Sequence, residues 1–166
     1  MRVEIVRRRP LVVILCLLGA ACSASSRTTQ KTSVTTAAPS TEHVAVTAPC
    51  STPSHFGTDE AANEIHGTSA NGELWGLAFG HVPPRVGEEL KIVWRMTGTG
   101  PLHVVFTAPD GSRQPLVFGP EAHPGSTYRR PGDEWGTGFR FTVGGCWHIH
   151  LSRMDTSGDI LLDVRA

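Results

Sequence analysis

Two histidines near the end of the chain have the spacing of a metal-binding pair. His148 and His150 flank Ile149, so on a β-strand both imidazoles project from the same face, ~6.5–7 Å apart along the chain. Imidazoles placed in this way can close on one Zn²⁺ or Cu²⁺ ion at ~2.0–2.1 Å each. The pattern predicts a copper or zinc site. The alternative is a pair of solvent-facing histidines on an exposed sheet.

Two ligands do not complete a metal site, and the sequence offers three further donors. His103 falls on the predicted outer face of its own strand and could be the third ligand, as could His123 in a predicted loop. The thiolate of Cys146 would also complete the set, but a disulfide bond would consume it.

A loop that ends at Trp135 combines aromatic and cationic side chains. Tyr128, Arg130 and Trp135 are of the types that are typical of recognition surfaces, and such side chains can also hold a sugar ring or a carboxylate. These three are the candidate binding residues. In the alternative arrangement, Trp135 closes one end of the fold and Arg130 pairs with Asp133 or Glu134.

Motifs of catalysis are missing from the sequence. It has no Gly-x-Ser-x-Gly turn, no phosphate-binding glycine loop and no His-Glu-x-x-His zinc motif. The acidic pairs Glu88-Glu89 and Asp133-Glu134 are adjacent, and neighbours on a strand face opposite ways. These carboxylates are therefore poor acid–base partners and are expected to be solvated. We expect a protein that is not an enzyme.

The candidate residues must be positioned by β-strands, because alternation of apolar side chains is the strongest pattern in residues 50–166. Six segments carry an apolar residue at every second position and are separated by turns that contain Gly, Pro or Asp. The six apolar sets are Trp75, Leu77 and Phe79; Leu90, Ile92 and Trp94; Leu102, Val104 and Phe106; Phe139, Phe141 and Val143; Trp147, Ile149 and Leu151; and Ile160, Leu162 and Val164.

Each set is expected to face the core of an antiparallel sheet whose other face is solvated. A seventh, weaker strand is expected within residues 113–118, and hairpin turns are expected at Pro109-Asp110-Gly111 and Ser157-Gly158-Asp159. About seven short strands in this length predict an all-β fold, an immunoglobulin-like antiparallel β-sandwich.

The first 21 residues have the organisation of a bacterial export signal. Arg7, Arg8 and Arg9 precede an apolar run of eight residues, Leu11 to Leu18, and small residues follow. Eight residues are too few for a permanent membrane span, which needs ~20. We therefore expect residues 1–21 to be a signal peptide.

The segment Leu18-Gly19-Ala20-Ala21-Cys22 resembles the lipobox of bacterial lipoproteins, with Gly19 at the position where that motif prefers Leu. The resemblance implies that Cys22 is lipidated and anchors the protein on the extracytoplasmic side of the cell membrane. Two or three acyl chains hold a protein stably at a bilayer. The alternative is ordinary cleavage after Ala21 or Ala24, which would give a secreted protein.

Residues 22–49 join Cys22 to the predicted strands. From Ser23 to Pro49, twelve of the 27 residues are Ser or Thr and none is aromatic. Such a stretch cannot bury enough apolar surface to offset the entropy of ordering it. The sequence therefore predicts three parts: the signal peptide, a flexible tether at 22–49 and a sandwich domain at 50–166.

Charge excludes one class of partner. The chain has 15 basic and 15 acidic residues, and removal of the first 21 residues leaves 11 basic and 14 acidic. A domain with this acidic excess lacks the basic footprint of nucleic-acid-binding proteins. We expect the membrane, through the lipid, and an envelope protein or glycan as partners, and no nucleic acid.

Cys50 and Cys146 remain as a pair once Cys16 is removed with the signal peptide and Cys22 carries the lipid. In an oxidising compartment such a pair predicts a disulfide bond, worth ~4–5 kcal/mol on the chain-entropy model. Cys146 points away from Trp147 by strand parity. The bridge should therefore join the start of the domain to an outer face or edge.

Two motifs, RPGDEWGTGF at Arg130–Phe139 and GGCW at Gly144–Trp147, are similar to a family of uncharacterised secreted proteins and lipoproteins that is common in actinobacteria. The similarity covers about residues 72–164. It implies the fold and the exported location, and it brings no activity and no catalytic residue.

Together these features predict a lipid-anchored lipoprotein of the cell envelope that acts as a non-catalytic binding or interaction module. The ligand is unknown, and no cofactor is expected. The alternative prediction is an envelope lipoprotein that binds copper or zinc through His148 and His150.

Overall fold

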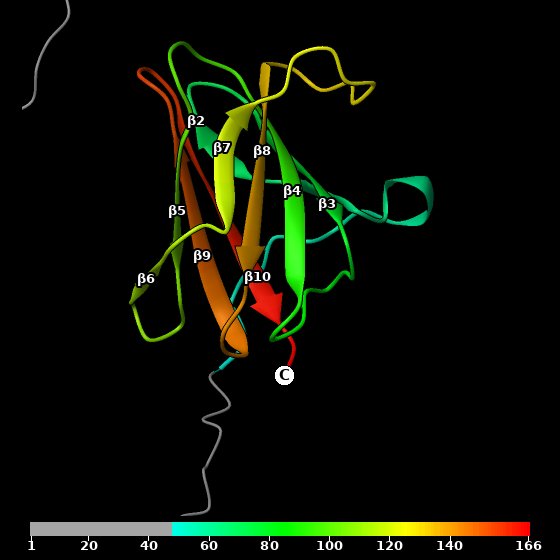
Figure 1. The fold of residues 1–166 in the computed structure, drawn as a ribbon, viewed down its shortest axis with the longest axis vertical. Coiled ribbons are helices and arrows are strands. Elements are labelled where there is room, and N and C mark those ends of the chain that lie inside the picture. The colour runs from blue at the N-terminus through cyan, green and yellow to red at the C-terminus, as the bar shows by residue number, and fades with distance from the viewer. Residues whose placement is uncertain (1–47) are drawn as a thin grey trace, which may run out of the picture. The chain divides into compact units, whose positions relative to one another are not determined.

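The computed structural model describes residues 48–166. The predictions for the signal peptide at 1–21, for lipidation of Cys22 and for nearly all of the tether at 22–49 lie outside the described residues. The described residues form two five-stranded antiparallel sheets that pack face to face (Figure 1). None of their helical segments is long and apolar enough to cross a membrane. The predicted all-β sandwich is confirmed, and its immunoglobulin-like character stays a prediction.

The two sheets, here named sheet A and sheet B, each mix strands from distant parts of the sequence. Sheet A contains, in spatial order, β1 (Glu64–His66), β3 (Leu74–Phe79), β4 (Glu89–Met96), β8 (Asp133–Arg140) and β7 (Phe118–Ala122). Sheet B contains β2 (Thr68–Ala70), β10 (Ser157–Val164), β9 (Gly145–Ser152), β5 (His103–Thr107) and β6 (Arg113–Gln114). A 3₁₀ turn, η1 (Asp59–Ala61), precedes β1.

Residues 48–166 form ten strands, whereas the sequence predicted about seven. The weak strand expected at 113–118 is divided between β6 and β7, which belong to different sheets. The short strands β1 and β2 come from a polar segment in which only Ile65 is deeply buried among the strand residues. Edge strands can pair through backbone groups alone, so such strands have no apolar alternation that would predict them.

Large aromatic side chains fill the space between the sheets. The rings of Phe106 and Phe139 stack with centroids 3.9 Å apart, and Trp147 meets Phe139 edge-on at 5.4 Å. The buried indole of Trp94 donates a hydrogen bond of 2.8 Å to Thr137 Oγ1. The predicted inward faces of β4, β9 and β10 are confirmed, since their apolar sets are at most 5 % exposed.

One predicted inward face is wrong, and a second fails at one position, since Val143 follows the end of β8 and is 38 % exposed. Trp75, Leu77 and Phe79 do share a face of β3, but it is the outer face of sheet A, and Phe79 is 54 % exposed. The inner face of β3 instead carries small residues such as Gly76, where an added Cβ would lie 2.8 Å from the ring of Trp94. The Trp94 indole occupies the core beside the middle of β3, so only Leu74, at the start of the strand, is a large inward side chain, and Trp75, Leu77 and Phe79 point outward.

One of the two predicted hairpin turns is confirmed. Gly111 has a positive φ of 84° and closes the β5–β6 turn through a hydrogen bond from its N–H to the Ala108 carbonyl. The turn predicted at residues 157–159 is wrong, because β10 already begins at Ser157. The turn of the β9–β10 hairpin lies at residues 153–156, where the Arg153 N–H donates to the Thr156 carbonyl at 2.8 Å. Asp159 is therefore a strand residue.

The predicted disulfide bond between Cys50 and Cys146 is present. Cys146 lies at an outward position of β9, opposite Asp163 of β10. The Asp163 carboxylate accepts a hydrogen bond of 2.6 Å from the Cys50 N–H. The described chain therefore starts beside the outer face of sheet B, at the end of the sandwich where the C-terminus also lies (Figure 1).

Candidate functional site

A pocket of about 340 Å³ lies on the outer face of sheet A, beneath the segment 123–128. Three apolar side chains that point away from the core, Leu77, Phe79 and Val93, form its sheet side. Leu77 is opposite Val93 in the β3–β4 register, and Phe79 is opposite Lys91. Ligand sites typically have volumes of ~300–1,000 Å³, so this pocket, here named the sheet A pocket, is large enough for a small ligand.

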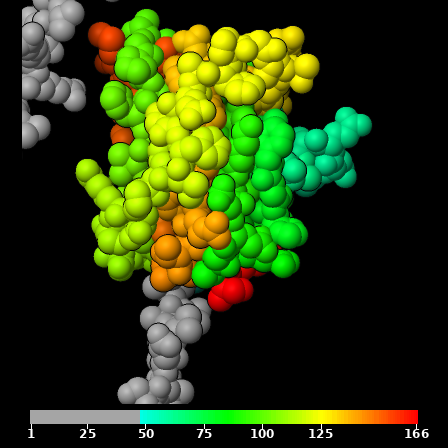
Figure 2. All heavy atoms as spheres, in the orientation of Figure 1, coloured from blue at the N-terminus to red at the C-terminus, as the bar shows by residue number. Residues whose placement is uncertain are grey.

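The other side of the pocket comes from the connection between β7 and β8. His123, Ser126, Thr127 and Tyr128 line it from this side. Figure 2 shows the connection (yellow) spread over the upper part of the front face, beside the green surface of β3 and β4. The pocket therefore depends on how this connection is held against the sheet.

Glu134 holds the connection down. Its side chain is only 2 % exposed, and its carboxylate accepts hydrogen bonds from Arg95 Nε at 3.0 Å, from His123 Nδ1 at 2.9 Å and from the Ser126 hydroxyl. The expectation that Asp133-Glu134 is a solvated pair is wrong for Glu134, because the segment from His123 to Ser126 folds over it. A buried carboxylate is stable only with such a set of donors.

Arg130 fastens the far end of the connection to two strands. Its guanidinium forms a two-pronged ion pair with Glu64 of β1, in which Nε lies 2.9 Å from Oε1. The same guanidinium lies 4.4 Å from the centroid of the Trp75 ring, which is stacked on His66. The predicted alternative, that Arg130 pairs with one of the acids just after it, is wrong.

Tyr128 lies in the wall of the sheet A pocket. Burial of its hydroxyl, together with the nearby negative charge of Glu64, raises the pKa of this phenol above its usual value. The phenol therefore stays neutral at physiological pH. Its hydroxyl is fully buried, so Tyr128 can offer a ligand an aromatic face and no charge.

Trp135 lies elsewhere. It belongs to β8 and not to a loop, it is 7 % exposed, and it packs in the core. The guanidinium of Arg153 lies 4.5 Å from the centroid of its ring and donates to the carbonyls of Met96 and Gly100. Trp135 thus helps to close one end of the sandwich, as the alternative predicted, and it is not among the residues that line the pocket.

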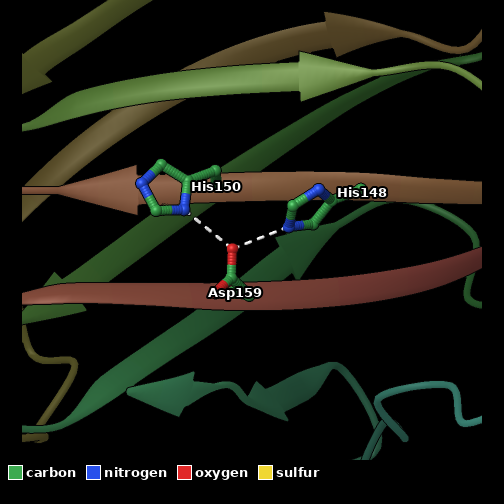
Figure 3. A group of neighbouring side chains, drawn as sticks. All are labelled: His148, His150 and Asp159. Atoms are coloured by element: carbon green, nitrogen blue, oxygen red, sulfur yellow. Dashed lines mark hydrogen bonds and ion pairs between the residues drawn. The ribbon is translucent and has the colours of Figure 1, made fainter. Parts of the chain in front are cut away.

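The two predicted metal ligands converge on the opposite side of the molecule, on the outer face of sheet B. His148 Nε2 lies 2.6 Å and His150 Nδ1 lies 2.7 Å from the same carboxylate oxygen, Oδ1 of Asp159 (Figure 3). Asp159 is directly opposite His150 in the β9–β10 register. Asp159 was not among the predicted ligands, because its sequence context predicted a turn and not a strand.

The other predicted metal ligands lie apart from this group. His103 is opposite Ser152 on the same outer face, and it is outside the three residues whose donor atoms come together. His123 binds Glu134 on sheet A, and the sulfur of Cys146 is in the disulfide bond.

Asp159 is an ionised group at neutral pH. Partial burial raises the pKa of its carboxyl, and the hydrogen bonds and positive charge of His150 and His148 lower it by more, so the net pKa lies below the ordinary value of 3.8. The cluster therefore presents a carboxylate and two imidazoles within reach of solvent.

The comparisons with known proteins give no further guide to either site: no protein-family model, no curated protein and no solved structure matches this chain.

Proposed function

We propose that the chain is a lipid-anchored, non-catalytic binding module of the cell envelope and that the sheet A pocket is its ligand site. The observation that carries the proposal is that β3 turns three bulky apolar or aromatic side chains outward, at a place where a fixed connection covers part of them. Exposed apolar surface with a few placed polar groups is typical of ligand sites.

The chemistry of the lining favours a small amphiphile that combines an apolar body with an anionic group. Leu77, Phe79 and Val93 offer apolar surface to the body. The charge of Glu134 is offset by Arg95, and His123 is hydrogen-bonded to the same carboxylate. Lys91, in contrast, has no acidic partner within ion-pair distance among the described residues. The Lys91 ammonium, 5.5 Å from the centroid of the Phe79 ring, would bind the anionic group.

The envelope location is supported by two features of different kinds. The lipobox-like sequence at Leu18–Cys22 and the export signal before it predict anchoring through Cys22. The disulfide bond between Cys50 and Cys146 suits an oxidising compartment outside the cytoplasm.

Binding of anilinonaphthalene sulfonate, a fluorescent dye with an apolar body and one anionic group, tests the pocket. We expect the oxidised full chain to bind the dye, and Phe79→Ser and Lys91→Glu to weaken binding by about fivefold or more, equivalent to ~1 kcal/mol each. Both side chains are exposed, so neither change should unfold the sandwich.

Matched controls change an exposed apolar residue and an exposed cation elsewhere. Met154→Ser lies in the β9–β10 turn, and Arg113→Glu lies on β6; both should bind the dye as the unaltered chain does. Equal binding by all four variants, or equal losses in all four, would refute the pocket as the ligand site.

A further inference from the structure

The outer face of sheet B holds its two histidines on a rigid support. β9 is an inner strand of this sheet, paired with β10 on one side and with β5 on the other. His148 and His150 alternate with Trp147 and Ile149, which are fully buried in the core. Packing on the inner face and hydrogen bonds on both edges therefore fix the backbone from which both imidazoles project.

The donor atoms of the cluster are close enough to share one ion. One ligand atom from each of His148, His150 and Asp159 lies within 4.8 Å of those of the other two. Donors bound to a zinc or copper ion at ~2.0–2.1 Å stand about 3.3 Å apart in a tetrahedral site. Rotation of the three side chains can produce this spacing without any movement of the strands.

The two short contacts of Asp159 are also explained by hydrogen bonds alone. A metal site is therefore supported by the arrangement of the two nitrogens and by their access to solvent. Both imidazoles turn a nitrogen toward the same carboxylate oxygen, from one side of the sheet (Figure 3). The three side chains are 46 %, 42 % and 44 % exposed, so an ion can reach them from solvent and keep water as its remaining ligands.

We propose that His148, His150 and Asp159 form an exchangeable binding site for a divalent transition-metal ion, with Cu²⁺ bound most tightly. Two imidazoles and a carboxylate are ligands for Cu²⁺ and Zn²⁺, and the general order of affinity places Cu²⁺ first. The nearest thiol on this face, Cys146, is consumed by the disulfide bond, so the site lacks the soft ligand that would favour Cu⁺.

This metal site is independent of the sheet A pocket. Its three residues belong to β9 and β10 of sheet B, whereas the pocket is built on β3 and β4 of sheet A and on the connection above them. The result of the dye experiment therefore has no bearing on the metal site, and failure of one proposal leaves the other standing.

Isothermal titration of the oxidised full chain with Cu²⁺ and with Zn²⁺ tests the site. We expect one equivalent of either ion to bind, Cu²⁺ more tightly. His148→Ala, His150→Ala and Asp159→Asn should each weaken binding at least about tenfold, because even loss of an outer-shell partner weakens metal sites by 10–100-fold. Electron paramagnetic resonance of the Cu²⁺ form should show coupling to two imidazole nitrogens, and to one in either histidine variant.

His103→Ala is the matched control, because His103 is an exposed histidine on the same outer face, opposite Ser152 and apart from the cluster. It should bind both ions as the unaltered chain does. The proposal is overturned if the unaltered chain retains no ion, if His148→Ala and His150→Ala bind normally, or if His103→Ala loses as much affinity as they do. Circular dichroism of each variant shows whether the sandwich is intact.

Discussion

The guanidinium of Arg130 lies 4.4 Å from the centroid of the Trp75 ring while it also pairs with Glu64. Trp75 is on β3 and Glu64 is on β1, so a single cation ties the connection between β7 and β8 to two strands of sheet A. The connection forms one wall of the sheet A pocket. The shape of the pocket therefore depends on a residue that does not line it.

Replacement of Arg130 by Ala should loosen the connection. The change removes an ion pair and a cation–π contact, so the free energy of unfolding should fall. Hydrogen exchange of the amides in residues 123–130 should become faster, while exchange in β9 should not change.

Arg140→Ala is the control for this variant. Arg140 is at the other end of β8 and pairs with Glu89 on the surface. Its removal should leave hydrogen exchange in the connection unaltered. If the two variants gave the same exchange pattern, the fastening role of Arg130 would be wrong.

Two glycines of β8 should respond in opposite ways to a methyl group. A Cβ at Gly136 would meet no atom within 4 Å, whereas a Cβ at Gly138 would overlap the ring of Phe118. Gly136→Ala should raise the free energy of unfolding by about 0.5–1 kcal/mol through reduced chain entropy. Gly138→Ala should lower it by about 1–3 kcal/mol through overpacking. Urea unfolding measures both, and equal effects would contradict the argument.

The stability that Asp159 contributes should depend on pH. Its pKa in the folded chain is below the ordinary 3.8, so the folded state favours the ionised form. This contribution is complete above the unfolded pKa and is lost as pH falls through the folded one. The groups that face the carboxylate are His148 and His150.

Asp159→Asn should therefore be less stable than the unaltered chain at pH 7, and the difference should vanish as the pH falls through the lowered pKa of the folded chain. Urea unfolding of both proteins between pH 2 and pH 7, without added metal, measures the difference. Glu121→Gln, an exposed substitution on β7, is the control. If the difference in stability between the two proteins grew toward pH 2, the ionised form of Asp159 would not be the stabilising one.

Reduction of the bond between Cys50 and Cys146 should destabilise the domain substantially. The two cysteines are 96 positions apart, and loss of a native disulfide in a small domain costs ~2–5 kcal/mol. Cys146→Ser should show the same loss in urea unfolding without reductant. Added reductant should then have no further effect on the variant. Cys50 is the one cysteine that remains in residues 48–166, so these residues contain no disulfide bond to reduce.

Anchoring through Cys22 remains a prediction from sequence, and it has a direct test. In a bacterial host that processes lipoproteins, the expressed chain should partition with the membrane fraction. Cys22→Ala should prevent lipidation and release the mature chain from that fraction, because the acyl chains that hold the protein at the bilayer are then missing. Equal membrane association of both proteins would rule out the lipid anchor.

Alternation predicted the inward faces of several strands and failed for β3, and the difference has a physical cause. In β9 the large apolar side chains occupy one face and the polar ones the other, so the alternation identifies the buried face without ambiguity. In β3 both faces are mainly apolar, and the smaller one, which includes Gly76 and Ala78, is inside. The choice depends on the space taken by Trp94 of another strand, which lies outside any local pattern.

The dependence on contacts between distant segments also explains which site residues were predicted and which were missed. His148 and His150 are two positions apart, so their common face could be predicted from the segment alone. Asp159 joins them only through the register of β9 with β10, and Glu134 is buried only because the segment after His123 folds over it. Contacts between segments of this kind need the tertiary structure.

The bridge between Cys50 and Cys146 also determines how mechanical tension would enter the domain. A pull on the residues before Cys50 passes through the sulfur–sulfur bond directly into β9 and bypasses the chain between the two cysteines. β9 is hydrogen-bonded to β10 and to β5, so the load is shared across the middle of sheet B. The weakly paired segment at Ser54, which joins β10 near Leu161, is spared from being peeled away. A domain held from this end can therefore resist drag while both of its outer faces stay intact.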